Sequence, residues 1–171
     1  MRKKLVLCAL ILVCMGIGIA ACIFPRPMTA ENMFPGVSPK DCTEIQVYYG
    51  TSPEADDLSL TLTPEDAAFT DLLKLLCTQK YRRSLRSLFP DVTRTHRWTN
   101  GDFYWDISLR FGATPLPDGS VISGTLLHFN DFFGTLIVRF NGADWRCSTN
   151  GQKVWRSAVM DTILQAAEEA S

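Results

Sequence analysis

The strongest constraint on the fold of this chain is a strict alternation of side chains over residues 103–111, which read FYWDISLRF. Successive side chains of a β-strand point to opposite faces, so a period of two marks a strand that is buried on one face only. One face of this segment would be apolar and aromatic, and the other would carry Asp106, Ser108 and Arg110. The pattern therefore predicts a sheet with one covered face and one polar face.

Five further segments show a similar pattern, and short turn sequences such as Asn141-Gly142 separate several of them. Short connections and Asn-Gly turns favour antiparallel pairing. The predicted strands are residues 44–49, 57–62, 120–129, 134–140 and 144–148, and the turn between the third and fourth of these is placed at Asn130-Asp131.

Two segments have helical spacing of apolar residues. Thr63-Pro64-Glu65-Asp66 is typical of a helix start, and it precedes a predicted helix over about residues 64–79. A second helix is predicted over about residues 152–169. The expected fold class is α+β, with a single antiparallel sheet of about five to six strands, two helices packed on one face, and the order ββαββββα. Residues 42–171 would form this single globular domain.

The N-terminus has the layout of an export signal. Arg2, Lys3 and Lys4 form a basic head, and residues 5–24 carry no charge. This run contains Ile19-Ala20-Ala21-Cys22, which resembles the lipobox of bacterial lipoproteins. The resemblance implies that residues 1–21 are a signal peptide, that Cys22 receives a diacylglycerol, and that the mature protein is anchored by lipid on the extracytoplasmic face of the cell membrane.

Two other interpretations of this segment remain open. Twenty apolar residues are enough to span a bilayer as an uncut anchor. An ordinary signal peptidase could also cut after Ala21 and release a secreted protein. All three interpretations place the domain outside the cytoplasm. The layout of the mature domain resembles the small uncharacterised domains of many Gram-positive lipoproteins, with no motif that fixes a family.

Residues 22–41 contain four prolines, which favour extended backbone. We expect a Pro-rich tether that holds the domain up to roughly 60 Å from the membrane. Apolar residues such as Phe34 within it indicate that part of the tether packs on the domain.

Residues 80–98 contain six basic residues and one acid, with aromatic residues among them. Guanidinium groups beside flat rings bind phosphates and carboxylates. The candidate ligand-binding residues are Arg82, Arg83, Arg86, Tyr81 and Trp98. The alternatives are a solvated face or ion pairs with the acidic segment 54–71. The net charge of −1 gives no reason to expect a nucleic-acid partner.

No catalytic or metal-binding motif occurs in the sequence, so no cofactor, metal or catalytic residue is predicted. Asp102 and Asp106 would lie roughly 13 Å apart along one strand, too far for a paired acid–base site. Cys77 is expected to be buried in a helix, while a disulfide between Cys42 and Cys147 remains open.

The sequence therefore predicts a non-catalytic binding or interaction domain, for an anionic envelope ligand or a partner protein. A small extracytoplasmic hydrolase is the alternative.

The lipid anchor gives a direct test. Cells supplied with a labelled fatty acid should incorporate the label into the wild-type protein and not into a Cys22→Ser variant, because only the cysteine thiol forms the thioether to diacylglycerol. The measurement is label in the purified protein together with its N-terminal sequence. Label that persists in Cys22→Ser, or a mature N-terminus other than residue 22, would contradict the assignment.

Overall fold

The structure is a computed structural model of the full chain. It describes residues 2–23, 26–34, 36–51, 58–84, 103–112, 114–115, 121–122, 124–132 and 134–170.

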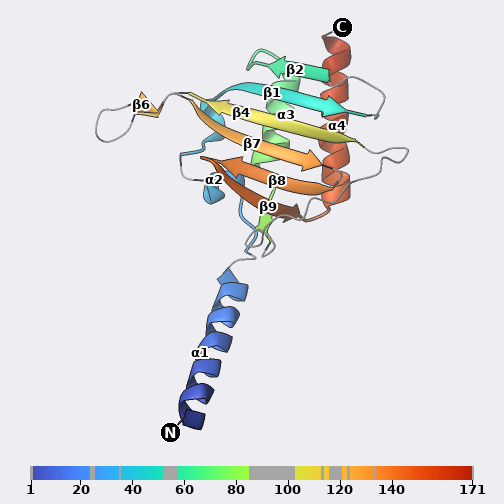
Figure 1. The fold of residues 1–171 in the computed structure, drawn as a ribbon. Helices are drawn as coiled ribbons and strands as arrows, with labels where there is room; N and C mark the ends of the chain where they lie inside the picture. Colours follow the sequence, from blue (N-terminus) through green and yellow to red (C-terminus); the bar gives the residue numbers. More distant parts are fainter. Residues whose placement is uncertain are drawn as a thin grey trace.

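An antiparallel sheet of seven strands dominates the described part of the chain, in the order β2-β1-β4-β7-β8-β9-β3 (Figure 1). β4 occupies residues Tyr104–Phe111 and lies between β1 and β7, so the segment with the clearest alternation is an interior strand. The other strands of this sheet are β1 (Cys42–Gly50), β2 (Leu58–Leu62), β3 (Tyr81–Arg83), β7 (Thr125–Phe132), β8 (Thr135–Phe140) and β9 (Ala143–Thr149).

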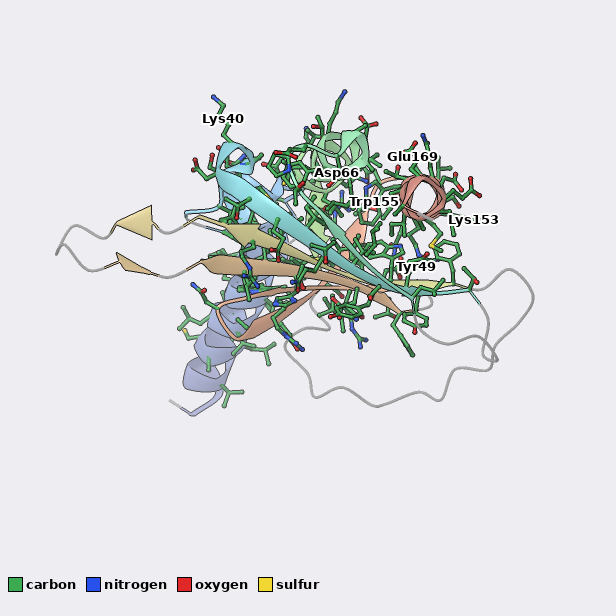
Figure 2. All side chains as sticks on the ribbon, turned by 90° about the horizontal axis from the view of Figure 1, so that it is seen from above. Lys40, Tyr49, Asp66, Lys153, Trp155 and Glu169 are labelled. Atoms are coloured by element: carbon green, nitrogen blue, oxygen red, sulfur yellow. The ribbon has the colours of Figure 1, made fainter. Side chains whose placement is uncertain are left out.

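Two helices cover one face of the sheet, as Figure 2 shows along the helix axes. They are α3 (Ala67–Cys77) and α4 (Gln152–Glu169). Trp155 of α4 packs edge-on against Trp105 of β4, with the ring centroids 5.7 Å apart, and its indole N–H donates to the carbonyl of Leu75 on α3 at 3.0 Å. This one side chain therefore joins both helices to the middle of the sheet.

The predicted fold class is confirmed, since the molecule is α+β with one antiparallel sheet, but the details differ. The sheet has seven strands rather than five to six, because the basic stretch contributes β3, which is too short to show a period in sequence. β5 (Thr114–Pro115) and β6 (Val121–Ile122) form a separate small ribbon. Besides α3 and α4, the described chain contains α1 (Arg2–Ile23) and α2 (Ala30–Met33).

One turn was predicted in the wrong place, and one predicted helix begins about one turn later than expected. Asn130 and Asp131 lie inside β7 rather than in a turn, and the chain reverses at Gly134, which has a φ of +84° that favours glycine. α3 begins at Ala67 rather than at 64, because Asp66 is its N-cap residue. The carboxylate of Asp66 accepts hydrogen bonds from the backbone N–H and the hydroxyl of Thr63, at 2.6 and 3.0 Å, and closes the preceding turn.

The segment expected to be a tether is docked on the domain from Met28 onward, and we call its described residues 28–34 and 36–41 the docked segment. Met28 and Tyr81 exchange two backbone hydrogen bonds, with N···O distances of 2.9 and 2.7 Å. Phe34 is 2% exposed, and its ring packs against those of Phe140 and Trp145. The 3₁₀ helix η1 (Pro39–Asp41) then leads directly into β1. The boundary at residue 42 is therefore wrong, because the core includes residues from Ala30 onward.

α1 projects from the end of the molecule at which β3 lies (Figure 1). Its large apolar side chains between Val6 and Ile19 are 50–68% exposed, so they contribute nothing to the domain core. In the part of the chain that the structure describes, no helix meets the combined length and apolarity that a membrane span requires.

Candidate binding edge and polar face

The edge strand β3 presents Arg82 to solvent. Arg82 lies opposite Ser148 of β9, is exposed, and makes no ion pair with any described residue. Lys80 precedes β3 and Arg26 precedes the docked Met28, and both of these side chains are also exposed. We call Arg26, Lys80 and Arg82 the basic edge.

Tyr81 does not belong to this surface, and its predicted role as a flat ligand partner is corrected. Its side chain is 0% exposed and packs against the rings of Phe129 and Trp155. Its hydroxyl donates to the carbonyl of Leu76 at 2.5 Å, and burial raises the pKa of the phenol well above its usual range. The alternation of a strand explains the difference, because Tyr81 and Arg82 must point to opposite faces.

Arg83 is positioned against the domain rather than offered to a ligand. Its guanidinium lies over the ring of Trp145, which in turn contacts Phe34 of the docked segment. Burial lowers the pKa of Arg83 from its ordinary value. This cation–π contact supports the docked segment at the end of β3. Arg86 and Trp98, the two other predicted ligand-binding residues, lie outside the described residues.

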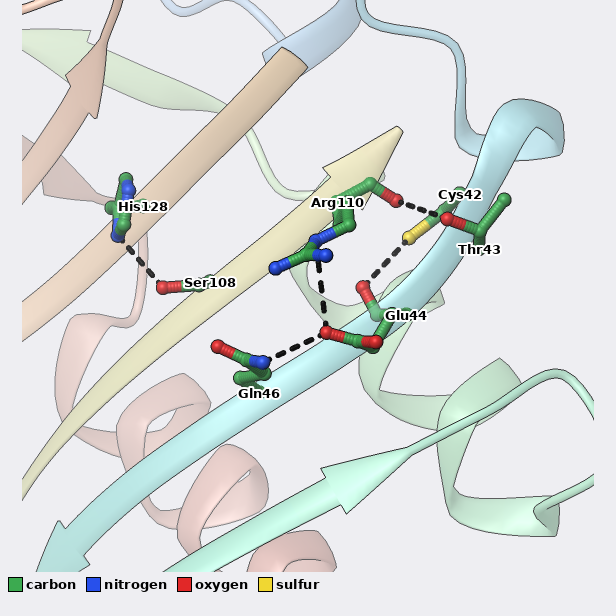
Figure 3. Close-up of polar contacts among 7 residues, drawn as sticks. All are labelled: Cys42, Thr43, Glu44, Gln46, Ser108, Arg110 and His128. Atoms are coloured by element: carbon green, nitrogen blue, oxygen red, sulfur yellow. Dashed lines mark hydrogen bonds and ion pairs between the residues drawn. The ribbon is translucent and has the colours of Figure 1, made fainter. Parts of the chain in front are cut away.

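The helix-free face of the sheet carries a row of polar side chains at one register level. The row crosses five strands and consists of Gln46, Ser108, His128, Arg139 and Asp144. Ser108 Oγ lies 2.7 Å from Nδ1 of His128 (Figure 3). Arg139 donates two hydrogen bonds to the carboxylate of Asp144 at 2.5 and 3.0 Å, and this pairing lowers the pKa of Asp144.

The Ser108–His128 pair was missed in the sequence because it depends on register. Both residues stand on polar positions of alternating segments, but nothing in the sequence says which position of β7 lies beside Ser108. A hydroxyl this close to an imidazole has the geometry of a nucleophile and its base. A hydrolytic triad also needs an acid that orients the imidazole. No carboxylate among the described residues contacts His128.

The nearest acids are already engaged with other groups. Asp144 lies two strands away from His128, about 10 Å between the strand backbones, and its carboxylate is held by Arg139. His128 also lowers the pKa of Asp144, but only as a smaller electrostatic effect after the pairing with Arg139. Asp106 accepts a hydrogen bond from Asn130 at 3.2 Å. Asp102, the other carboxylate considered from the sequence, lies outside the described residues.

The same polar face is locally charge-balanced near the start of β1 (Figure 3). Glu44 accepts a hydrogen bond from Gln46 at 2.8 Å and lies 3.7 Å from the guanidinium nitrogen of Arg110. Both partners are partly exposed, so the pair contributes little to stability. Because these charges are already paired with each other, this end of the face is a weaker candidate for binding a charged ligand than the basic edge.

A buried ion pair fixes α4 to the other end of β7. Asp131 is fully buried on the helix-covered face and accepts hydrogen bonds from Arg156 of α4 and from the backbone N–H of Gly134, the latter at 3.0 Å. Arg156 also stacks 4.8 Å from the centroid of Phe103. Burial raises the pKa of Asp131, while Arg156 opposes that rise. The pair holds the end of the sheet closed and is not accessible to a ligand.

The cysteines of the domain are free thiols. Cys42, Cys77 and Cys147 are all buried, and burial raises their pKa values to about 11, 12 and 12. The disulfide between Cys42 and Cys147 that the sequence left open is absent. β1 and β9 are four strand intervals apart, about 19 Å, whereas bridged Cα atoms lie within about 7 Å. The expectation that Cys77 is a buried residue is confirmed.

A surface groove of about 440 Å³ runs between the docked segment and α3. Its floor is largely apolar, and it is lined by Thr29, Glu31, Pro39, Thr70, Leu73, Lys74, Cys77 and Thr78. Within the described residues, no group of three or more His, Cys, Asp or Glu side chains is arranged to hold a metal ion.

Comparison with known proteins adds no candidate. No family model, no curated protein and no solved structure matches this chain. The functional assignment therefore rests on the geometry of the basic edge and of the polar face.

The buried ion pair gives a pH-dependent test. Arg156→Met should lower the free energy of unfolding by about 3–5 kcal/mol at neutral pH, because it leaves the Asp131 carboxylate buried without its partner. The pKa of Asp131 should then rise further. Between the ordinary aspartate pKa and this raised value the native state binds more protons than the unfolded state, so stability falls as pH rises. Urea unfolding at several pH values measures this slope.

The matched control is the double variant Asp131→Asn/Arg156→Met, which removes both charges. It should lack the added pH slope and should be more stable than Arg156→Met at neutral pH. A loss of stability in Arg156→Met that is the same at every pH would contradict the role assigned to the pair.

Proposed function

We propose that this chain is a lipid-anchored extracytoplasmic protein whose domain binds an anionic ligand at the basic edge and performs no catalysis. The single observation that carries the binding role is the exposure of Arg26, Lys80 and Arg82 at one edge, without an ion pair to any described residue. The lipid anchor is carried by the lipobox-like Ile19–Cys22 and by the exposed apolar surface of α1, which suits a segment recognised in the membrane.

The chemistry of the ligand follows from the groups at the edge. Guanidinium and ammonium groups donate charge-assisted hydrogen bonds to phosphate or carboxylate oxygens. A strand edge presents them in a row on a rigid backbone, so that an extended anionic chain or a surface fits better than an enclosed small molecule. Phosphodiester groups of the cell envelope are the class of ligand that this arrangement favours.

Charge reversal at the basic edge tests the binding role. Full-length protein purified from membranes in mild detergent should be retained on immobilised poly(glycerol phosphate), and Arg82→Glu should elute at lower salt because it replaces an attraction by a repulsion. Lys40→Glu is the matched control, since it reverses an exposed charge on η1, away from β3. Equal retention of wild type and Arg82→Glu would refute binding at this edge.

The contact between Ser108 and His128 favours a second candidate function, a small hydrolase that uses Ser108 as nucleophile. His128 contacts the hydroxyl through Nδ1, and the part of the chain that the structure describes provides no acid that orients its Nε2. We therefore rank this function below anionic binding.

A serine-directed fluorophosphonate separates the two functions. If the domain is a binding module, the full-length protein should remain unlabelled, because an imidazole without an orienting acid does not activate the hydroxyl enough to displace fluoride. The measurement is intact mass followed by peptide mapping. Labelling at Ser108 that is abolished in both Ser108→Ala and His128→Ala would establish the hydrolase instead.

A further inference from the structure

We propose that the ligand of the basic edge is the anionic phospholipid surface of the same membrane that carries the lipid at Cys22, so that the domain stands on the membrane with β3 towards the headgroups. This inference rests on the proposed function and specifies its ligand. It follows from where the docked segment attaches to the domain, from how few residues separate that point from Cys22, and from the distribution of charge between the two edges of the sheet.

The point of attachment is fixed by backbone and side-chain contacts. Met28 pairs with Tyr81 on the side of β3 that faces away from β9, and so extends the sheet by one bridge. Just beyond it, Ala30 is 0% exposed and Phe34 is 2% exposed. The chain is therefore held at the β3 edge from Met28 onward, and only the residues before it connect the domain to the anchor.

The connection is short. Six residue steps separate Cys22 from Met28, which extend to at most about 22 Å. Arg26 lies within this connection, between the lipid and the edge. By contrast, β2 forms the opposite edge, six strand intervals or about 29 Å further away. An anchor at Cys22 therefore keeps β3 close to the headgroups in every orientation, and it leaves β2 free to point away.

The charges of the two edges favour that orientation. The basic edge carries Arg26, Lys80 and Arg82, whereas exposed acids gather near β2. Those acids are Glu65 and Asp66 before α3, and Glu168 and Glu169 at the end of α4, which lies beside β2 (Figure 1). An anionic surface attracts the first set and repels the second. The docked segment also carries the exposed acid Glu31, which lines the groove together with Lys74.

A pair of matched probe positions tests the orientation. Ser148 of β9 lies opposite Arg82, and Ser59 lies on β2, and both side chains are exposed. Two variants of the full chain are made, each with a photoreactive amino acid at one of these positions, and both are matured in cells and purified. Each is then reconstituted into vesicles of phosphatidylcholine with or without phosphatidylglycerol. Flotation measures anchoring, and mass spectrometry measures lipid adducts at each position.

We expect several-fold more lipid adduct at position 148 than at position 59, and more in vesicles that contain phosphatidylglycerol. High salt should reduce the adduct, because the screening length falls from about 10 Å at 0.1 M to about 3 Å at 1 M. Adding Arg82→Glu should reduce the adduct at position 148, whereas adding Lys40→Glu should not.

The outcomes separate the two levels of the proposal. A mature protein that does not float with either vesicle would contradict the lipid anchor, and with it the proposed function. A protein that floats but forms equal adducts at both positions would overturn the orientation, and adducts that do not depend on phosphatidylglycerol would overturn the anionic headgroup as the ligand of the edge, while the lipid anchor would stand in both cases. Retention on poly(glycerol phosphate) without a phosphatidylglycerol effect would assign the edge to an envelope polymer and overturn the membrane as its ligand.

Discussion

The pairing of Met28 with Tyr81 determines how the N-terminal segment and the sheet relate to each other. β3 has only three residues, and it is held on one side by β9 and on the other by this bridge. Tyr81 then reaches inward to the rings of Phe129 and Trp155, and Arg82 must point outward. One interaction thus explains the docked segment, the buried tyrosine and the exposed arginine.

The two faces of the sheet have different physical roles. The covered face contains the aromatic core around Trp105 and Trp155, and it includes one buried charge, Asp131, that Arg156 compensates. The open face pairs its own charges across neighbouring strands, as Arg139 does with Asp144. Three exposed basic residues without an ion pair to any described residue, Arg26, Lys80 and Arg82, gather at the β3 edge, which is why the proposed ligand is placed there rather than on the open face.

The sequence alone was sufficient to predict those elements in which a regular pattern of apolar residues continues over many residues. The alternation over residues 103–111 predicted β4, and helical spacing predicted α3 and α4 to within a few residues. It failed where tertiary contacts override local signals. Asn130-Asp131 has the composition of a turn, but Arg156 compensates the buried carboxylate and allows Asp131 to remain in β7.

The candidate site was less predictable than the fold. The basic stretch indicated the right edge, but only the strand geometry of β3 separates Arg82 from the buried Tyr81 and from Arg83, which lies over Trp145. The contact between Ser108 and His128 depends on the register between β4 and β7, and a single sequence does not contain that information.

Amide hydrogen exchange of the mature protein tests the central claim most directly, since protection reports whether a backbone hydrogen bond is opened. If the segment is docked, the N–H groups of Met28 and Tyr81 should exchange slowly, because each donates a hydrogen bond to the carbonyl of the other. Their exchange should be about as slow as that of the neighbouring amides of β9. The N–H of Arg26, before the bridge, should exchange fast. Fast exchange at both Met28 and Tyr81 would show that the segment is a free tether and would contradict the account.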